Sequence, residues 1–138
     1  MDTFVRRFII MSIVYLGVAS LVGIAMLGSD RAMAFKFVHS HLNMLGWVSM
    51  MIYGVGYHIL PKFMGRQMYS RRLGEVQFWI ANIGLVAMLV FYTLNVYSPS
   101  DAMVVATVLA GVLETVSIFL FFYNMLKTLM PPVEVPGS

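Results

Sequence analysis

All three histidines of this 138-residue chain lie in one largely apolar stretch, residues 37–61, which reads FVHSHLNMLGWVSMMIYGVGYHILP. His39, His41 and His58 are therefore imidazoles in a segment apolar enough to sit in a bilayer. A charged side chain at membrane depth costs about 2.5–3.5 kcal/mol on insertion scales, so ionisable residues there usually serve a function. Since neutral imidazole is the commonest metal ligand and a ready proton carrier, this stretch is the first candidate for chemistry.

Glu114 is a further candidate, because it lies in the middle of another apolar stretch, VLAGVLETVSIFLFF. A carboxyl group at that depth is either protonated or paired with a cation or metal. A functional role and a structural hydrogen bond to a neighbouring helix are both open for it. The chain has no cysteine, which excludes thiolate metal sites and iron–sulfur clusters, so metal chemistry must use His, Met, Tyr or carboxylate.

The elements that carry these residues are predicted from composition. The chain is 60% hydrophobic and 11% charged, with a mean hydropathy of +0.85, which is typical of an integral membrane protein. Four apolar stretches, 8–28, 37–60, 76–97 and 102–126, are each long enough to cross a membrane, which takes about 20 helical residues. We therefore expect an all-α, antiparallel four-transmembrane-helix bundle that forms one domain over residues 1–138. A loop over 61–75 and a short tail over 129–138 complete the expectation.

Basic residues indicate how the bundle lies in the membrane. With four helices threaded, two cations, Arg31 and Lys36, fall on one side, and all the others fall on the opposite side: Arg6, Arg7, Lys62, Arg66, Arg71, Arg72 and Lys127. The positive-inside rule then places both termini and the 61–75 loop in the cytoplasm. A multi-pass protein of the cell inner membrane, with lipid as its surroundings, is expected, and the net charge of +3 requires no nucleic acid.

Helical periodicity divides the 37–60 helix into two faces. One stripe is polar at its outer end and small in its middle: His39, Asn43, Gly46, Met50, Gly54 and Tyr57. The other lies roughly opposite: His41, Met44, Val48, Met51, Val55 and His58. We expect one face to look into the bundle and the other to look toward lipid or a partner subunit.

The spacing also limits which histidines can share a ligand. Residues two apart on a helix point about 200° from each other, so His39 and His41 should not bind one metal ion. His58 lies about 25 Å farther along the axis than His41. Hydrogen-bonded histidines near the headgroups are the plain alternative for the first two, and an interfacial position beside Tyr57 is the alternative for His58. Trp47 is either a membrane-belt residue or a ring near a flat cofactor.

The runs HSHLNMLGW and GVGYHILP resemble a helix of the large subunit of the heme-copper oxidase superfamily, especially its nitric oxide reductase branch. In that branch a histidine two residues before an asparagine is an axial ligand of the low-spin heme b, which His41 and Asn43 match. An aromatic pair before a proline is matched by Tyr57, His58 and Pro61. The resemblance, which extends over about residues 36–97, implies a heme b-binding protein. In the topology above the heme would lie near the outer leaflet, where Arg31 and Lys36 would either pair with its propionates or be ordinary rim charges.

The chain also departs from that family. The large subunit has twelve helices in three arcs of four, whereas four are expected here, and the second axial ligand and the copper or non-heme iron ligands are missing. One copy therefore cannot be a complete oxidase or nitric oxide reductase. A twofold homodimer would place His41, or His39, from each protomer on the two sides of one heme. A Met ligand or a five-coordinate iron would make a second histidine unnecessary. A trimer would imitate the twelve-helix arrangement.

Motif alignment favours His41 as the ligand, and the small stripe, with room for a porphyrin, favours His39; we expect His41. The expected function is electron transfer, diatomic gas binding or heme handling. Two alternatives stay open. A small metal or proton conduit would be lined by His39, Asn43, Tyr57 and Glu114. A cofactor-free accessory subunit of a respiratory complex would use its histidines only for packing.

Overall fold

Three long apolar helices dominate the computed structural model, which describes residues 1–130: α1 (Thr3–Gly28), α4 (Arg71–Tyr97) and α5 (Asp101–Leu129). Each is long and apolar enough to cross a membrane. The described part of the chain is helical wherever it has regular structure and contains no strand. The prediction of an all-α membrane protein is therefore confirmed.

The expected helix over residues 37–60 is present, but it is divided into segments of different helix types. A 3-10 helix η1 (Asp30–Phe35) leads into α2 (Lys36–His41), a π-helical segment η2 (Leu42–Ser49) and α3 (Met50–Phe63). The Ser49 hydroxyl donates to the Met44 carbonyl, five residues earlier, at 2.8 Å, as a widened turn allows. No one of these pieces has the length of a membrane span, so the described residues give three candidate spans where four were expected.

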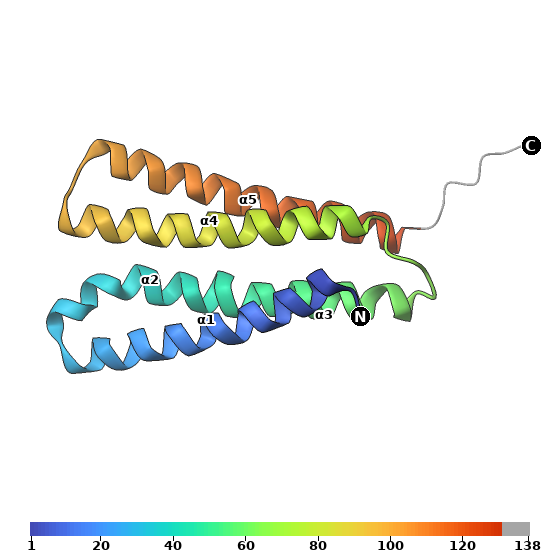
Figure 1. The fold of residues 1–138 in the computed structure, drawn as a ribbon, viewed down its shortest axis with the longest axis horizontal. Helices are drawn as coiled ribbons and strands as arrows, with labels where there is room; N and C mark the ends of the chain where they lie inside the picture. The colour runs from blue at the N-terminus through green and yellow to red at the C-terminus, as the bar shows by residue number, and fades with distance from the viewer. Residues whose placement is uncertain (131–138) are drawn as a thin grey trace, which may run out of the picture.

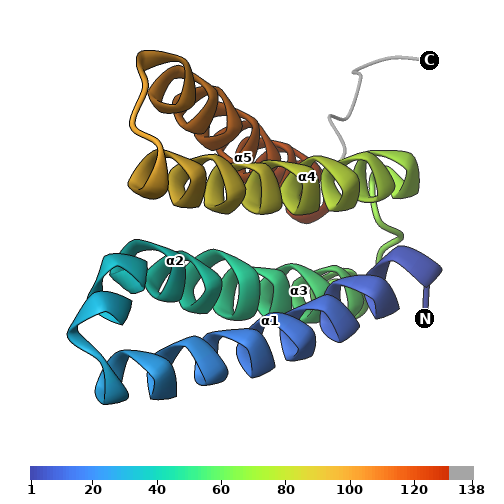
Figure 2. The ribbon, with the colours of Figure 1, turned by 60° about the vertical axis from the view of Figure 1, so that its left-hand side comes forward.

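The helices form two hairpins that lie side by side (Figures 1 and 2). In one hairpin α1 runs along α2, η2 and α3, and in the other α4 runs along α5. The start of α1 and the end of α5 lie at the same end of the molecule (Figure 1). This end also carries most of the basic residues, and we call it the basic end.

The helices begin and end at other residues than the predicted apolar stretches do, because helix caps and polar first turns extend them. Ser70 caps α4 by accepting from the Leu73 amide at 3.2 Å, so α4 begins five residues before the predicted apolar stretch. Ser100 caps α5 in the same way. The α3 helix continues through Pro61 and is followed by Gly65 at φ +61°, which glycine adopts without strain. The predicted tail over 129–138 lies outside the described residues from 131 onward.

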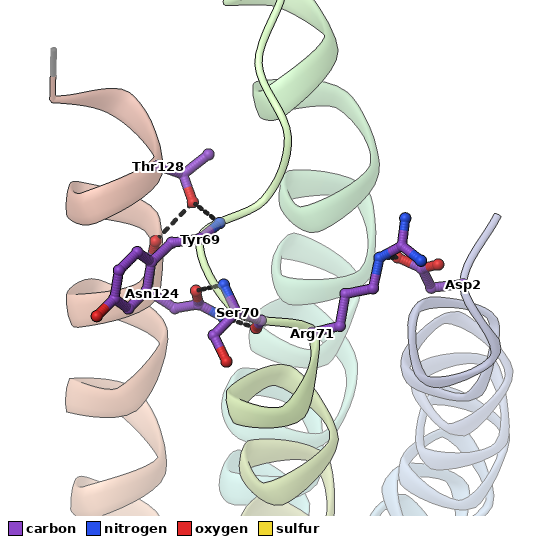
Figure 3. A network of polar contacts seen from close by, with 6 residues as sticks. All are labelled: Asp2, Tyr69, Ser70, Arg71, Asn124 and Thr128. Carbon is purple, nitrogen blue, oxygen red and sulfur yellow. Dashed lines mark hydrogen bonds and ion pairs between the residues drawn. The ribbon is translucent and has the colours of Figure 1, made fainter. Parts of the chain in front are cut away.

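Hydrogen bonds join the link between the hairpins to α5 at the basic end (Figure 3). The Asn124 side chain accepts from the Ser70 amide at 3.1 Å and donates to the Ser70 carbonyl at 2.8 Å. Thr128 accepts from the Tyr69 amide at 3.1 Å. These bonds fix where α4 begins relative to α5.

A cluster of aromatic rings fills the core at the same end. Tyr57 stacks on or meets edge-on the rings of Phe4, Phe8 and Phe121 at centroid distances of 5.2–6.2 Å. These rings come from α1, α3 and α5, so they join the two hairpins. The cluster places Tyr57 in the interior, with 2% of its surface exposed.

Candidate functional site

The two faces predicted for the helix over residues 37–60 are present. Gly46, Met50, Gly54 and Tyr57 of the first stripe are buried, and Met44 and Val55 of the second are exposed. A Cβ at Gly46 would lie 2.8 Å from Tyr15 of α1, and one at Gly54 would lie 2.7 Å from Ile9. The small stripe is therefore filled by α1 and has no room beside it for a porphyrin.

His39 is half-buried against α1, with both ring nitrogens in hydrogen bonds. Its Nδ1 lies 3.0 Å from the Ala19 carbonyl oxygen, and because a carbonyl only accepts, Nδ1 carries the proton. Its Nε2 accepts a long hydrogen bond of 3.4 Å from the Asn43 side chain. Asn43 also donates to the His39 carbonyl at 2.9 Å. The ring is thus held between α1 and its own helix.

His41 lies on the other face, at the end of α2. Its Nδ1 donates to the Phe37 carbonyl at 2.9 Å, which leaves the lone pair on Nε2. That nitrogen has no hydrogen bond to another described residue. The His41 ring packs on Phe37 at 3.8 Å between centroids, and Phe37 stacks on Tyr92 of α4 at 4.1 Å. His41 is therefore oriented by its own backbone and backed by aromatic rings, with a free basic nitrogen.

The remaining candidates near this end of the helix are more exposed. Trp47 is 36% exposed and lies within η2. Arg31 and Lys36 are exposed and precede His41 by a few residues, in η1 and at the start of α2. A π-helical segment such as η2 is rare and is frequent at functional sites. Here it begins immediately after His41.

His58 and Tyr57 lie at the basic end, far from the other two histidines. His58 Nε2 is 3.0 Å from the Lys62 ammonium. Both residues line a pocket of about 250 Å³ that Asp2, Arg66 and Arg71 also line. The three histidines therefore occupy three separate places, and the described residues contain no group of three His, Cys, Asp or Glu side chains that could bind a metal ion.

Glu114 is buried between the hairpins, with 2% of its surface exposed. A Cβ added at Gly84 of α4 would lie 2.9 Å from the Glu114 backbone nitrogen, so α4 and α5 are in close contact here. Neither carboxyl oxygen of Glu114 has a hydrogen-bond partner among the described residues. Of the residues suggested for a conduit, His39 bonds to Ala19 of α1 and to Asn43, Tyr57 bonds to Gln77 and Asn124, and no hydrogen bond joins Glu114 to them in the described part of the chain.

Five buried polar residues other than Glu114 escaped sequence reasoning, each at most 3% exposed: Ser12, Gln77, Ser117, Asn124 and Thr128. Tyr57 donates to the Gln77 side-chain oxygen at 2.7 Å, and Asn124 donates to the Tyr57 hydroxyl at 3.4 Å. Their signal in the sequence is a polar residue inside an apolar helix, which is the same signal that singled out Glu114.

Fold and site together define an all-helical membrane protein whose histidines lie on a helix interrupted by a π-helical segment. The family model for cytochrome c and quinol oxidase polypeptide I matches residues 3–97, more than half of the chain. The chain belongs to this family. The match extends from α1 to the end of α4 and includes all three histidines.

Relatives of known name agree with this assignment. The chain is 35% identical over 88 residues to the cbb3-type cytochrome c oxidase subunit CcoN1 of Stutzerimonas stutzeri, a match that covers 59% of this chain and 19% of the relative. It is 32% identical over 88 residues to a cytochrome c oxidase subunit 1 homolog of Agrobacterium tumefaciens, covering 58% and 16%. A cytochrome c oxidase subunit 1 of Rhodobacter capsulatus is 41% identical over 49 residues, covering 35% and 9%. The chain thus spans less than a fifth of the length of each of these relatives.

Proposed function

We propose that this chain is a membrane heme b-binding protein in which His41 Nε2 is an axial ligand of the iron. One observation carries the proposal: the Nδ1 hydrogen bond to Phe37 at 2.9 Å fixes the tautomer of the half-buried His41 and leaves Nε2 without a hydrogen bond to a described residue. Metal-bound histidines commonly donate their other ring N–H to such a carbonyl. His39 is a poorer ligand, since both its ring nitrogens are engaged within the chain.

The residues around His41 suit a flat, apolar group with an anionic edge. Phe37 and Tyr92 form an aromatic wall beside the imidazole. Arg31 and Lys36, both exposed and a few residues before His41, are suited to pair with propionates. When bound, heme supplies one-electron redox chemistry and, if one axial position is open, affinity for diatomic gases. Electron transfer, gas binding or heme handling are the corresponding roles.

A second axial ligand would come from another copy of the chain. The outward face that carries His41 also exposes Met44 and Ile52, by 62% and 54%, so a partner has an apolar surface to contact. A twofold dimer would bring two His41 side chains to one heme. A trimer, in which three copies replace the arcs of the full-length subunit, is the competing assembly.

The membrane topology belongs to the same proposal. Residues 36–63 are helical throughout. At 1.5 Å per residue a helix of this length is about 40 Å long, enough to cross a hydrocarbon core of about 30 Å. These residues would therefore add a span to the three long helices. An antiparallel four-helix bundle in the cell inner membrane then has both termini in the cytoplasm, by the positive-inside rule. His41 lies toward the outer leaflet in that topology.

The test is the absorbance spectrum of detergent-purified protein from a heme-replete host, with a pyridine-hemochrome assay and a size measurement. We expect heme b in the wild type, retained in His39→Ala and lost in His41→Ala. His58→Ala is the matched control, because it removes an imidazole at the opposite end. Circular dichroism shows whether each variant is folded.

Two results would overturn the proposal. A folded wild-type protein without heme would favour the cofactor-free accessory subunit. A heme spectrum that survives His41→Ala in full would reassign the ligand. Heme content per particle tests the assembly: one heme for two chains is expected of a dimer with two His41 ligands.

A further inference from the structure

Four buried side-chain atoms of α4 and α5 have no hydrogen-bond partner in the described part of the chain. They are the two carboxyl oxygens of Glu114, the hydroxyl of Ser117 and the side-chain nitrogen of Gln77. These side chains are 2%, 0% and 0% exposed. Glu114 and Ser117, three residues apart, share one face of α5, and Gln77 comes from α4.

Such atoms are too costly to stay unpaired. A buried polar group without a partner costs about 1–3 kcal/mol, so four cost about 4–12 kcal/mol. That sum is comparable with the whole stability of a typical domain, about 5–15 kcal/mol. A buried water molecule makes two to four hydrogen bonds with groups of this kind and is small enough for a packed interior. Water is therefore the ligand class that this chemistry fits.

The charge on Glu114 follows from its surroundings. Within the described residues no cation forms an ion pair with it, the one ion pair there being Asp2 with Arg71. Tyr15 of α1 is a neutral phenol, because its hydroxyl donates to Asn82 of α4 at 2.7 Å. A buried carboxylate without a cation is far less favourable than the neutral acid. Glu114 therefore carries a proton.

A hydrogen bond at the basic end joins one of these side chains to the pocket there. The Gln77 side chain, whose nitrogen is unpartnered, accepts through its oxygen from Tyr57 at 2.7 Å. Tyr57 also lines the pocket of about 250 Å³ at the basic end, beside His58 and Lys62. Gly84 of α4 contacts Glu114, and Gln77 comes seven residues earlier in α4, so Gln77 is nearer to the basic end than the buried carboxyl is.

We propose that Glu114, Ser117 and Gln77 form an internal water site at which Glu114 holds a proton that exchanges with the solvent at the basic end. In exchange, the Glu114 O–H bond breaks as its proton passes to the adjacent water, that water returns one of its own protons to the other carboxyl oxygen, and it later passes the acquired proton to solvent water, so Glu114 remains a neutral acid. Glu114 lies about 20 Å from either end of α5, near the expected midplane. It also lies beyond residues 3–97, so the family match does not include it.

Infrared spectroscopy of the purified protein tests the proposal, independently of whether heme is bound. We expect a carboxylic-acid C=O band that disappears in Glu114→Gln, remains in Glu75→Gln, which changes an exposed carboxyl of α4, and shifts after transfer to D₂O. Ser117→Ala should keep the band and shift its frequency. Gln77→Met should slow the D₂O shift several-fold.

Three outcomes would overturn the proposal: a folded wild type without the band, a band unchanged by Glu114→Gln, and a band that does not shift in D₂O. The first two contradict the protonated carboxyl, and the third contradicts its contact with water. If Glu114→Gln does not fold, the frequency in Ser117→Ala decides, since an unchanged frequency means that no hydrogen bond links the two side chains through water.

Discussion

Gly46→Ala tests whether the small residues of the histidine helix serve helix packing. The added Cβ would lie 2.8 Å from both Cβ and Cγ of Tyr15, and 3.2 Å from its Cδ2. Carbon atoms prefer about 3.5–4.0 Å, so α1 must retreat by roughly 0.7–1.2 Å or the tyrosine must turn. Turning is restricted, because Tyr15 is 6% exposed and its hydroxyl donates to Asn82 of α4 at 2.7 Å.

The expected cost is about 1–3 kcal/mol for overpacking, with about 1 kcal/mol more if the Tyr15–Asn82 hydrogen bond breaks. Reversible unfolding of the detergent-solubilised protein measures it. Gly17→Ala is the matched control. Gly17 lies on the same helix as Tyr15, and a Cβ added there would have no atom within 4 Å. A Gly46→Ala protein within about 0.5 kcal/mol of the wild type would refute this account of the α1 contact.

The remaining predictions concern the contacts of α5 and are measured by the same unfolding assay. Gly84→Ala should destabilise the protein by about 1–3 kcal/mol, because its Cβ would lie 2.9 Å from the backbone nitrogen of Glu114. Gly111→Ala is the control and should be near neutral, because its Cβ would make an ordinary 3.7 Å contact. Equal effects of the two substitutions would contradict the reasoning. Asn124→Leu should destabilise by about 2–5 kcal/mol, because it leaves the amide and the carbonyl of Ser70 without their partner; an unchanged stability would show that water replaces the side chain.

The helical membrane class could be predicted from sequence because it depends on apolar length alone. Both faces of residues 36–63 could also be predicted, since periodicity determines which side chains lie together. The π-helical segment Leu42–Ser49 could not, because it depends on backbone hydrogen bonds rather than on composition. The first turns of α4 escaped prediction for a related reason: they are polar, and the Ser70 cap, not hydrophobicity, sets their start.

The site was predicted in part. Residue types pointed to His39, His41 and Glu114, but the orientation of a ring nitrogen depends on which carbonyl it meets. Ala19 belongs to another helix, so its bond to His39 is invisible in the sequence. The pairing of Tyr57 with Gln77 likewise depends on how α3 and α4 are aligned.

Imidazole rescue of His41→Gly tests the central claim most directly. Removing the side chain should abolish the heme b spectrum, and added imidazole should restore it by occupying the vacated space as a free ligand. His39→Gly should keep the spectrum without imidazole. A complete spectrum in folded His41→Gly protein before imidazole is added would contradict the assignment of His41 as the iron ligand.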